Sequence, residues 1–528
     1  MTTTRQITSV LTEPIEFEER RTANTSRLRG IPAICGLIAL GIAAMSGCSS
    51  IKQVPTDHIV MMNGRGNPVD PTGNIGCANE PPCNGSHLWL TSYPEMQRDR
   101  YDTYLSTLFD AMKREAPLVN GKRRVLLFIH GGLNTQVGTI ERAGHLFQPI
   151  KNGGYYPIFI NWQSSLFSSY FDHLLHIRKG QDLDWKGIPF APFYLLTDVA
   201  RSVARAPVVW WHLFWNDLMS IQFIRPESAT DAARIATDVK KEGIIDLAVG
   251  EDKRENPEMI LSGFSWFLTI PTKIVLAPAI DAFGTSAWDV MVRRTDLLFH
   301  TEEDFSTNSQ VAEEAHQHRG YQHAQPYGGL SVFMRRLQEE IARNGGVEAW
   351  DITLIGHSMG TIVLNHLIRD FGISPSGVMP FNHIVFMAGA ASLNDYEDSV
   401  FPYLTKNKSA QFYHLTLHPR AEIRDRWELV PYLDFPPRGS LLVWVDEFLA
   451  NPGTPHDRTV GSYTNLVAGL HNTPNELRQR IHIKAFHAGA SVEETDPQHH
   501  GEFSAPFKFW KPECWEPMRP STVACFGK

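Results

Sequence analysis

Residues 351–372 read DITLIGHSMGTIVLNHLIRDFG. A β-branched run ending at Ile355 leads into the pentapeptide GHSMG at 356–360, and apolar residues then recur at helical spacing as far as Gly372. This pattern predicts a strand, a sharp turn and a helix, with Ser358 at the apex of the turn. Glycines two residues either side of the serine let strand and helix approach closely, and the hydroxyl is expected to be exposed at the helix N-terminus.

The composition is that of a globular protein and excludes several classes of function. The 528 residues are 42% hydrophobic and 20% charged, with a net charge of −8 and no basic tract, so we expect no nucleic-acid partner. No phosphate-binding glycine loop and no dinucleotide fingerprint is present. His316, His318 and His323 cluster at spacings that fit no standard metal-binding helix. The sequence therefore predicts neither a metal nor an organic cofactor.

Strand and helix patterns alternate along most of the chain. The expected strands cover residues 124–129, 156–162, 352–355, 383–387, 411–417 and 481–486. Helical patterns between them, for example at 94–114, 137–151 and 440–449, predict an α/β fold with a mostly parallel sheet flanked by helices.

Residues 166–325 interrupt this alternation. They are rich in Trp and Phe and broken by several prolines, and we expect a large, mainly helical insertion that acts as a cap or lid. Its apolar stretches at 206–223 and 259–270 are too interrupted or too short for a membrane span. The insertion is expected to bury its own core, to border an acyl-binding pocket, or to touch a membrane surface.

The N-terminus has the features of an export signal. Arg27 and Arg29 precede an apolar run at 31–45 and the small residues before Cys48. The segment resembles the lipobox of bacterial lipoproteins, which implies a signal peptide over 1–48, a lipid-modified Cys48 and a membrane anchor. Residues 49–95 are then expected to be a tether with a cysteine-containing entry segment. The implied location is the bacterial cell envelope, at the outer membrane facing the periplasm or the exterior; an uncleaved anchor is the alternative.

Four cysteines lie beyond the predicted signal, in two close pairs. They are Cys77 with Cys83 and Cys514 with Cys525. An even number of cysteines in an exported protein favours disulfides, and both local pairing and pairing between the two ends are compatible with the sequence.

A nucleophilic serine needs a base, and the base needs an acid to orient it. In strand–turn–helix enzymes of this kind the partners follow in the order Ser, Asp or Glu, His. The base is expected after the last strand, and we favour His500 because Gly501 permits a tight turn, with His499 as the alternative. His487 lies too close to the end of the strand.

The acid is expected after strand 411–417. Glu422 is favoured because of its offset from this strand, Asp425 is the competing choice, and Asp395 after the preceding strand is a weaker one. Each could instead be an ordinary surface carboxylate.

The negative charge that develops on an acyl oxygen needs fixed donors. The backbone N–H of Met359, directly after the serine, is one candidate. The second should come from the loop His130-Gly131-Gly132-Leu133 after the first strong strand, through Gly132 or Leu133.

Residues 120–510 resemble the α/β-hydrolase fold of lipases and esterases. The matching motifs are Ile129-His130-Gly131-Gly132, GHSMG at 356–360 and His500-Gly501. The resemblance implies a core in two parts, 96–165 and 326–528, and hydrolysis of a lipid or other acyl ester through an acyl-enzyme, without cofactor. An acyltransferase, thioesterase or peptidase with the same triad, or a catalytically inactive envelope scaffold, are the alternatives.

Overall fold

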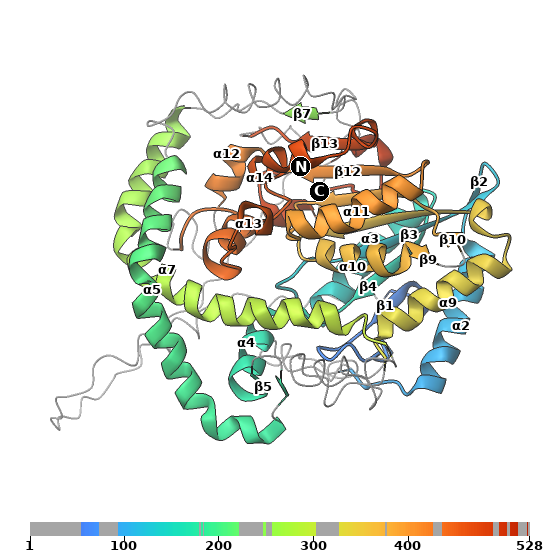
Figure 1. The fold of residues 1–528 in the computed structure, drawn as a ribbon, viewed down its shortest axis with the longest axis horizontal. Helices are drawn as coiled ribbons and strands as arrows, with labels where there is room; N and C mark the ends of the chain where they lie inside the picture. Colours follow the sequence, from blue (N-terminus) through green and yellow to red (C-terminus); the bar gives the residue numbers. More distant parts are fainter. Residues whose placement is uncertain are drawn as a thin grey trace, which may run out of the picture. The chain divides into compact units, whose positions relative to one another are not determined.

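The computed structural model describes residues 54–72, 93–178, 181–182, 184–220, 247–249, 256–301, 327–374, 377–425, 436–488, 496–503, 507–515 and 525. All of these residues belong to one compact unit, Gly47–Lys528. A central sheet with helices packed around it dominates the unit (Figure 1). The predicted α/β class with a mostly parallel sheet is confirmed.

Nine strands of the described chain form the sheet, in the spatial order β1–β4–β3–β8–β11–β12–β13–β7, with β2 paired to β3. Every neighbouring pair in this order is parallel, and only β2 is antiparallel to its partner. The bounds are β1 Ile59–Met61, β2 Leu118–Val119, β3 Lys122–Ile129, β4 Tyr156–Asn161, β7 Leu247–Val249, β8 Trp350–His357, β11 Phe381–Met387, β12 Gln411–Thr416 and β13 Ile481–Ala485. Two small hairpins pair β5 Ile177–Arg178 with β6 Gln181–Asp182 and β9 Ile373–Ser374 with β10 Gly377–Val378.

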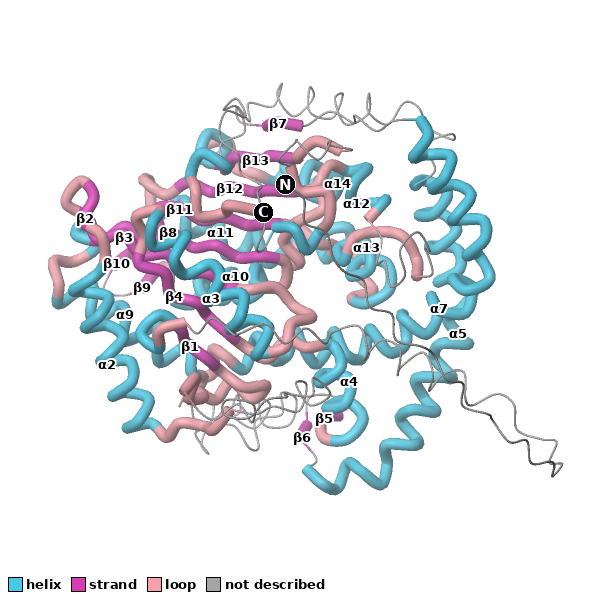
Figure 2. The backbone as a smooth tube through the Cα atoms, turned by 180° about the vertical axis from the view of Figure 1, so that it is seen from behind, coloured by secondary structure: helices cyan, strands magenta, loops and turns pink. Residues whose placement is uncertain are grey.

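Helices flank the sheet. Those of the described chain are α2 Arg98–Glu115, α3 Gln136–Asn152, α4 Leu166–Leu175, α5 Ala191–Ser220, α7 Asn256–Leu297, α9 Gly329–Arg343, α10 Gly360–Phe371, α11 Leu393–Lys406, α12 Pro419–Arg424, α13 Leu441–Trp444 and α14 Tyr463–Gly469. Short 3-10 or π turns, among them η3 Asp184–Phe190, η8 Val445–Leu449 and η12 His500–Phe503, supplement them. Figure 2 shows the strands from behind, with α3, α10 and α11 beside them. α10 packs against β8 and α11, and α3 packs against β4.

The order of the strands creates a switch point at β3. After β3 the chain moves to β4 on one side, and it later returns to β8 on the other side. The carboxyl ends of β3 and β8 are therefore neighbours, with Ile129 paired to Gly356. Ligands of open α/β sheets bind outside the carboxyl ends of strands at such a point. The loop at 130–134 and the turn at Ser358 both begin at this position.

The strands and helices next to the serine were predicted correctly, but several short strands were missed, among them β1 and β7. Residues 54–72, expected to be part of a tether, instead contain β1, which pairs with β4 and buries Val60 completely. Residues 247–249, inside the expected helical insertion, form β7 and extend the sheet beyond β13. Both strands have only three residues, too few for an alternating pattern to reveal them.

The described part of the insertion is mainly helical, and three of the prolines expected to break it lie inside helices. Pro207 lies within α5, and Pro271 and Pro278 lie within α7. Pro278 has no N–H for the carbonyl of Ile274, and the Nε1–H of Trp210 donates to that carbonyl instead, at 2.8 Å. In the described chain, α7 is the one helix long and apolar enough to cross a membrane, by length and composition alone, over Phe267–Leu297.

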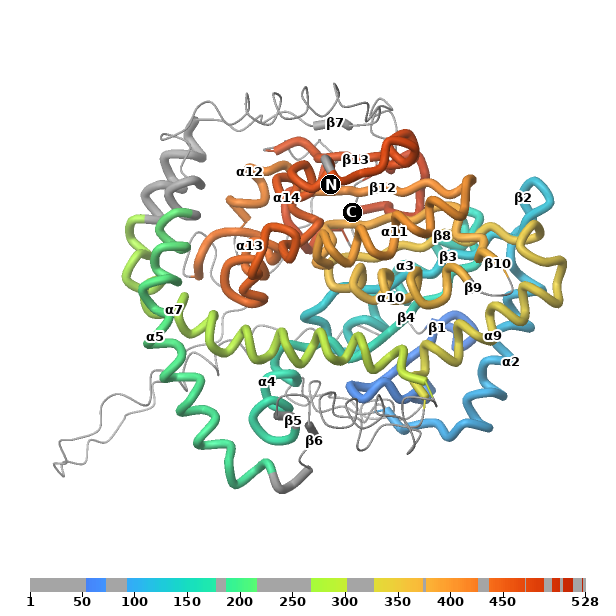
Figure 3. The backbone as a smooth tube through the Cα atoms, viewed as in Figure 1, coloured from blue at the N-terminus to red at the C-terminus, as the bar shows by residue number. Residues whose placement is uncertain are grey.

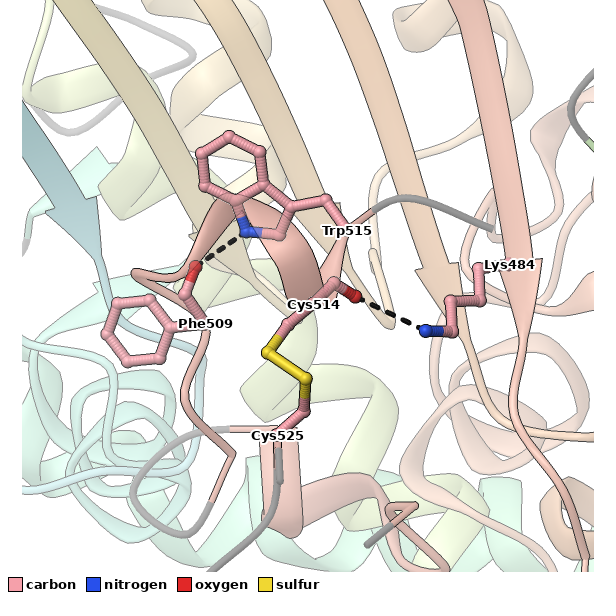
Figure 4. Close-up of a disulfide and its surroundings, with 5 residues drawn as sticks. All are labelled: Lys484, Phe509, Cys514, Trp515 and Cys525. Atoms are coloured by element: carbon pink, nitrogen blue, oxygen red, sulfur yellow. Dashed lines mark hydrogen bonds between the residues drawn. A yellow bond between two sulfur atoms is a disulfide. The ribbon is translucent and has the colours of Figure 1, made fainter. Parts of the chain in front are cut away.

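A disulfide closes the C-terminal segment. Cys514 and Cys525 are bonded, which is one of the local pairings that the sequence left open (Figure 4). The carbonyl of Cys514 lies 3.5 Å from Nζ of Lys484 on β13, and the Trp515 indole donates to the carbonyl of Phe509 at 2.7 Å. This segment therefore packs against the sheet. Cys48, Cys77 and Cys83 lie outside the described residues.

Candidate active site

The backbone at Ser358 adopts a left-handed conformation. Its φ is +51°, which is uncommon for a residue other than glycine and is sustained only by its surroundings. The Ser358 N–H donates to the carbonyl of Met387 at 2.9 Å, and its carbonyl accepts from Ala390 at 3.0 Å and from the hydroxyl of Thr361 at 2.7 Å. The ends of β8 and β11 and the first turn of α10 therefore hold the serine in this strained turn.

The two glycines of the pentapeptide are required by close packing. A Cβ at Gly356 would lie 2.7 Å from the Leu364 side chain, and a Cβ at Gly360 would lie 2.5 Å from the carbonyl oxygen of Ile129. Both distances are shorter than real contacts allow, so strand, turn and helix meet here as the sequence pattern predicted.

The loop after β3 packs directly on the serine. A Cβ at Gly131 would lie 2.9 Å from Cβ of Ser358. The His130 ring holds this loop: its Nε2 accepts from the N–H of Trp162 at 3.2 Å, so its Nδ1 carries the proton and donates to the Gly131 carbonyl at 2.7 Å. Burial lowers the pKa of His130 to about 4, so the ring is neutral in this role.

Hydrogen bonds to the carbonyls of the loop set the directions of its N–H groups. The Asn134 amide donates to the carbonyls of Gly131 at 2.9 Å and Gly132 at 2.8 Å. In a trans peptide the N–H points away from the carbonyl, so the Gly132 N–H faces away from Asn134. The Leu133 N–H donates to the carbonyl of Ser164 at 2.8 Å and is already used. Of the two expected donors in this loop, Gly132 therefore fits better than Leu133.

His500 lies in the interior beside the serine turn. It begins η12 and is 6% exposed, and its ring centroid is 5.1 Å from that of His357. Both ring nitrogens of His500, and Oγ of Ser358, are buried without a hydrogen-bond partner among the described residues. Burial lowers the pKa of His500 to about 4, and the negative charge of Asp425 opposes this shift. Residues 500–503 form a 3-10 turn, and a Cβ added at Gly501 would meet no atom within 4 Å, so this turn does not require a glycine for lack of space.

His357 links the two halves of the site, a role that the sequence analysis missed. Its Nε2–H donates to the carbonyl of His500 at 3.1 Å, so it ties the loop after β13 to the turn after β8. Burial is the main cause of a pKa well below the usual value for this ring. The only sequence signal for this role was its place directly before Ser358.

The structure brings Asp425, and not the favoured Glu422, to the two histidines. Asp425 is 6% exposed; one of its oxygens accepts from the backbone N–H of His500 at 3.0 Å, and the other lies 2.7 Å from Nδ1 of His499. Glu422, which the sequence analysis favoured, lies on α12, whereas Asp425 follows the helix and faces the loop at 499–500.

Glu422 is instead a buried carboxyl group next to Ser440. One of its oxygens is bonded to the Ser440 hydroxyl, and the other has no partner among the described residues. Burial raises the pKa of Glu422 to about 8, while the Ser440 bond opposes the shift and the charges of Asp425 and Asp446 add to it. A carboxyl group held in its protonated form cannot stabilise an imidazolium.

The remaining candidates lie apart from the serine or in other pairings. His487 is paired with Asp496 through a 2.5 Å contact. Asp395 lies in the first turn of α11, where its carboxylate accepts from the hydroxyl of the N-cap residue Ser392 at 2.9 Å. His499 is more than half exposed, in contrast to His500. Among the described residues no group of three metal-ligating side chains gathers.

The exposure of Ser358 differs from what the sequence predicted. Ser358 was expected to be exposed, yet it is 1% exposed, because the Gly131 loop and the His357 and His500 rings surround the turn.

No protein-family model matches the chain, and neither a curated protein nor a solved structure is significantly similar to it. The chemistry of the site therefore has to be argued from its own geometry.

Proposed function

We propose that this protein is a serine hydrolase that cleaves carboxylic esters, with Ser358 as nucleophile, His500 as base and Asp425 as acid. The observation that carries the proposal is the strained serine at φ +51°, at the switch point of a parallel sheet, next to His357, whose ring lies 5.1 Å from the buried His500 ring. Strained backbone at non-glycine residues clusters at active sites and ligand-binding sites.

The order of the three residues along the chain supports the same conclusion. Ser358 follows β8, Asp425 follows β12 and α12, and His500 follows β13. Serine, acid and histidine after successive parallel strands are the arrangement of the α/β-hydrolase fold, and the insertion between β4 and β8 is then a cap on that fold.

In the proposed reaction, His500 takes the proton from Oγ of Ser358 as the oxygen attacks the acyl carbon. The N–H groups of Met359 and Gly132 stabilise the oxyanion, and Asp425 stabilises the imidazolium. His500 then protonates the leaving alcohol, and water hydrolyses the acyl-enzyme by the same steps. With a pKa of about 4 in the resting site, His500 is neutral at pH 7 and able to accept a proton.

The proposed substrate is a lipid or another acyl ester, and the proposed location is the bacterial cell envelope, with Cys48 as lipid anchor. Because Ser358 is buried, the site must open before an ester can reach it. Rates that increase when ester substrates form micelles would agree with such an opening at an interface.

The test uses residues 47–528 with Cys48→Ser, since these residues form a compact unit. This protein should hydrolyse p-nitrophenyl esters and be labelled by a fluorophosphonate. Ser358→Ala should lower turnover by about 10⁴ to 10⁶-fold and abolish labelling. Ser331→Ala is the matched control, because Ser331 is equally buried but its hydroxyl donates to the carbonyl of Phe299.

Unchanged ester hydrolysis by the Ser358→Ala variant would refute the proposal. An unlabelled, inactive wild-type protein would favour the scaffold alternative. Transfer of the acyl group to an added alcohol or amine in preference to water would indicate an acyltransferase.

A further inference from the structure

The insertion has an unusually apolar outer surface. All but four of the large apolar side chains that are exposed in the described chain lie between Phe167 and Val275. Most belong to α5 and the first half of α7, which contact each other and run side by side at one end of the view in Figure 3. Patches of this kind mark interaction sites, whereas single exposed apolar residues do not.

The exposed residues form continuous stripes. On α5, Leu196, Val199, Val203, Trp210 and Phe214 recur at intervals of three, four or seven residues, which places them on one side of the helix. We call the exposed residues of α5 between Pro192 and Trp215, and of α7 between Phe267 and Val275, the apolar face.

The apolar face has no exposed charge. Over residues 191–215 and 267–288, none of the exposed side chains is charged. Its one exposed hydroxyl, on Thr197, already donates to the carbonyl of Phe193 in the same helix, at 2.9 Å. The carbonyl of Ile274, released by Pro278, is satisfied by Trp210. These polar groups are thus bonded within the protein, as hydrocarbon surroundings require.

Three charged residues of the same helices are buried, whereas Arg201 and Arg205 are partly exposed and Asp289, farther along α7, is exposed. Asp281 is completely buried and pairs with Arg205 at 2.8 Å, and Lys273 is 1% exposed. Asp198 is 5% exposed and accepts from the hydroxyl of Tyr170 at 2.9 Å. A helix on the surface of a water-soluble protein has the opposite arrangement, with apolar residues inside and charges outside.

We propose that the apolar face inserts into the hydrocarbon region of a lipid bilayer. A protein partner fits less well, because protein interfaces have a polar rim and about one hydrogen bond per 100–200 Å², and the exposed side chains of this face offer little beyond the indoles of Trp211 and Trp215 for such bonds. Together with Trp210, these exposed tryptophans are of the type enriched where bilayer and water meet.

The second half of α7 limits how the helices can lie. Ala277, Ala282, Trp288 and Met291 are buried, and this part of α7 packs against α10 and η8 of the body. Lipid therefore cannot surround α7 along its whole length, and the helices enter one leaflet from the side without crossing the bilayer. The predicted lipid anchor at Cys48, six residues before Val54, would also keep the protein at a membrane.

The proposal does not depend on the chemistry of Ser358, and its test is a binding measurement. Residues 47–528 with Cys48→Ser, which removes both the signal and the site of lipidation, are mixed with phosphatidylcholine vesicles and floated on a density gradient. The protein should float with the vesicles and should remain bound in 1 M NaCl, because no charge contributes to binding. The Ser358→Ala variant should bind equally well.

Charges introduced on the apolar face should abolish binding. Leu196→Glu, Val203→Glu and Trp211→Glu together should weaken partitioning by about 100-fold or more. The matched control carries Leu118→Glu, Val119→Glu and Val347→Glu, three exposed apolar residues elsewhere in the unit, and should bind like the wild type. Near-ultraviolet circular dichroism reports whether either variant has lost its fold.

A second measurement avoids disruptive charges. Vesicles with bromine-substituted acyl chains should quench the tryptophan emission of the wild type, and replacing the three exposed tryptophans by Phe should remove most of this quenching while flotation is kept. Wild-type protein that stays with the lipid-free fraction would overturn the proposal. So would binding lost at 1 M NaCl, quenching unchanged in the Phe variant, or a discrete dimer that the Glu variant dissociates.

Discussion

The proposed triad uses Asp425 as its acid, and its closest alternative uses Glu422, a second buried carboxyl group three residues earlier. Asp425→Asn should lower kcat by about 10³ to 10⁴-fold, because an amide in contact with the loop at 499–500 cannot stabilise an imidazolium on His500. Glu422→Gln should stay within about tenfold of the wild type, because Glu422 is bonded to Ser440 and held in its protonated form.

Glu422→Gln should instead change the pH dependence of stability. The pKa of Glu422 is raised from 4.5 to about 8 in the folded state. The stabilisation by its proton is complete below pH 4.5 and is lost as the pH rises toward 8. Each pH unit in this range lowers the free energy of unfolding by up to about 1.4 kcal/mol. Between pH 5 and pH 7 the wild type should therefore lose about 2 to 3 kcal/mol of this free energy, and Glu422→Gln should not.

The wild type, Asp425→Asn and Glu422→Gln are each tested for catalysis and for stability. Steady-state hydrolysis of a p-nitrophenyl ester gives kcat, and urea unfolding at pH 5, 6, 7 and 8 gives the free energy of unfolding. Glu476→Gln, which alters an exposed carboxylate, is the control and should follow the wild type in both. If Glu422→Gln abolished turnover while Asp425→Asn remained active, the assignment of the acid would be reversed. A pH slope in Glu422→Gln equal to that of the wild type would refute the argument from burial.

Three further predictions concern the base and the loop. His500→Ala should lower kcat by about 10⁴-fold or more, while His499→Ala stays within about tenfold; the opposite ranking in the same ester assay would make His499 the base. The acid limb of the kcat/KM profile should fall near pH 4, where His500 becomes protonated, and a limb near 6.5 would contradict a buried base. Gly131→Ala should lower kcat by about 10²-fold, because its Cβ would lie 2.9 Å from that of Ser358. Gly501→Ala, whose Cβ would meet no atom within 4 Å, should leave kcat unchanged. Equal losses of kcat in the two variants would contradict the steric explanation.

The fold around the serine was predictable because its signals are local. A buried parallel strand appears in the sequence as a continuous apolar run, and β3 and β8 both have one. The GHSMG pentapeptide adds the glycines that only a close strand–helix contact requires. β1 and β7 escaped notice because three residues of strand depend on the partner strand for their conformation, and that partner is distant in sequence.

The identity of the acid was not predictable in the same way. Offset from β12 favoured Glu422, but the choice depends on which carboxylate faces a loop that follows β13, about 75 residues later. Two hydrogen bonds from that loop, from the N–H of His500 and from the His499 ring, go to Asp425, which is why Asp425 is the proposed acid. Periodicity and spacing contain no information on contacts between loops.

The sequence also could not predict which faces of the insertion's helices are exposed. A helical sequence with apolar and charged residues identifies two faces, and the usual assumption assigns the apolar face to the interior. On α5 that assumption fails, because Asp198 and Arg205 pair with Tyr170 and Asp281 inside the protein. These contacts join α5 to α4 and α7 within the insertion, and the fully exposed side chains that remain on α5 are mostly apolar. Under the proposed membrane binding, the exposed aromatic residues of α5 and α7 are the ones that contact lipid.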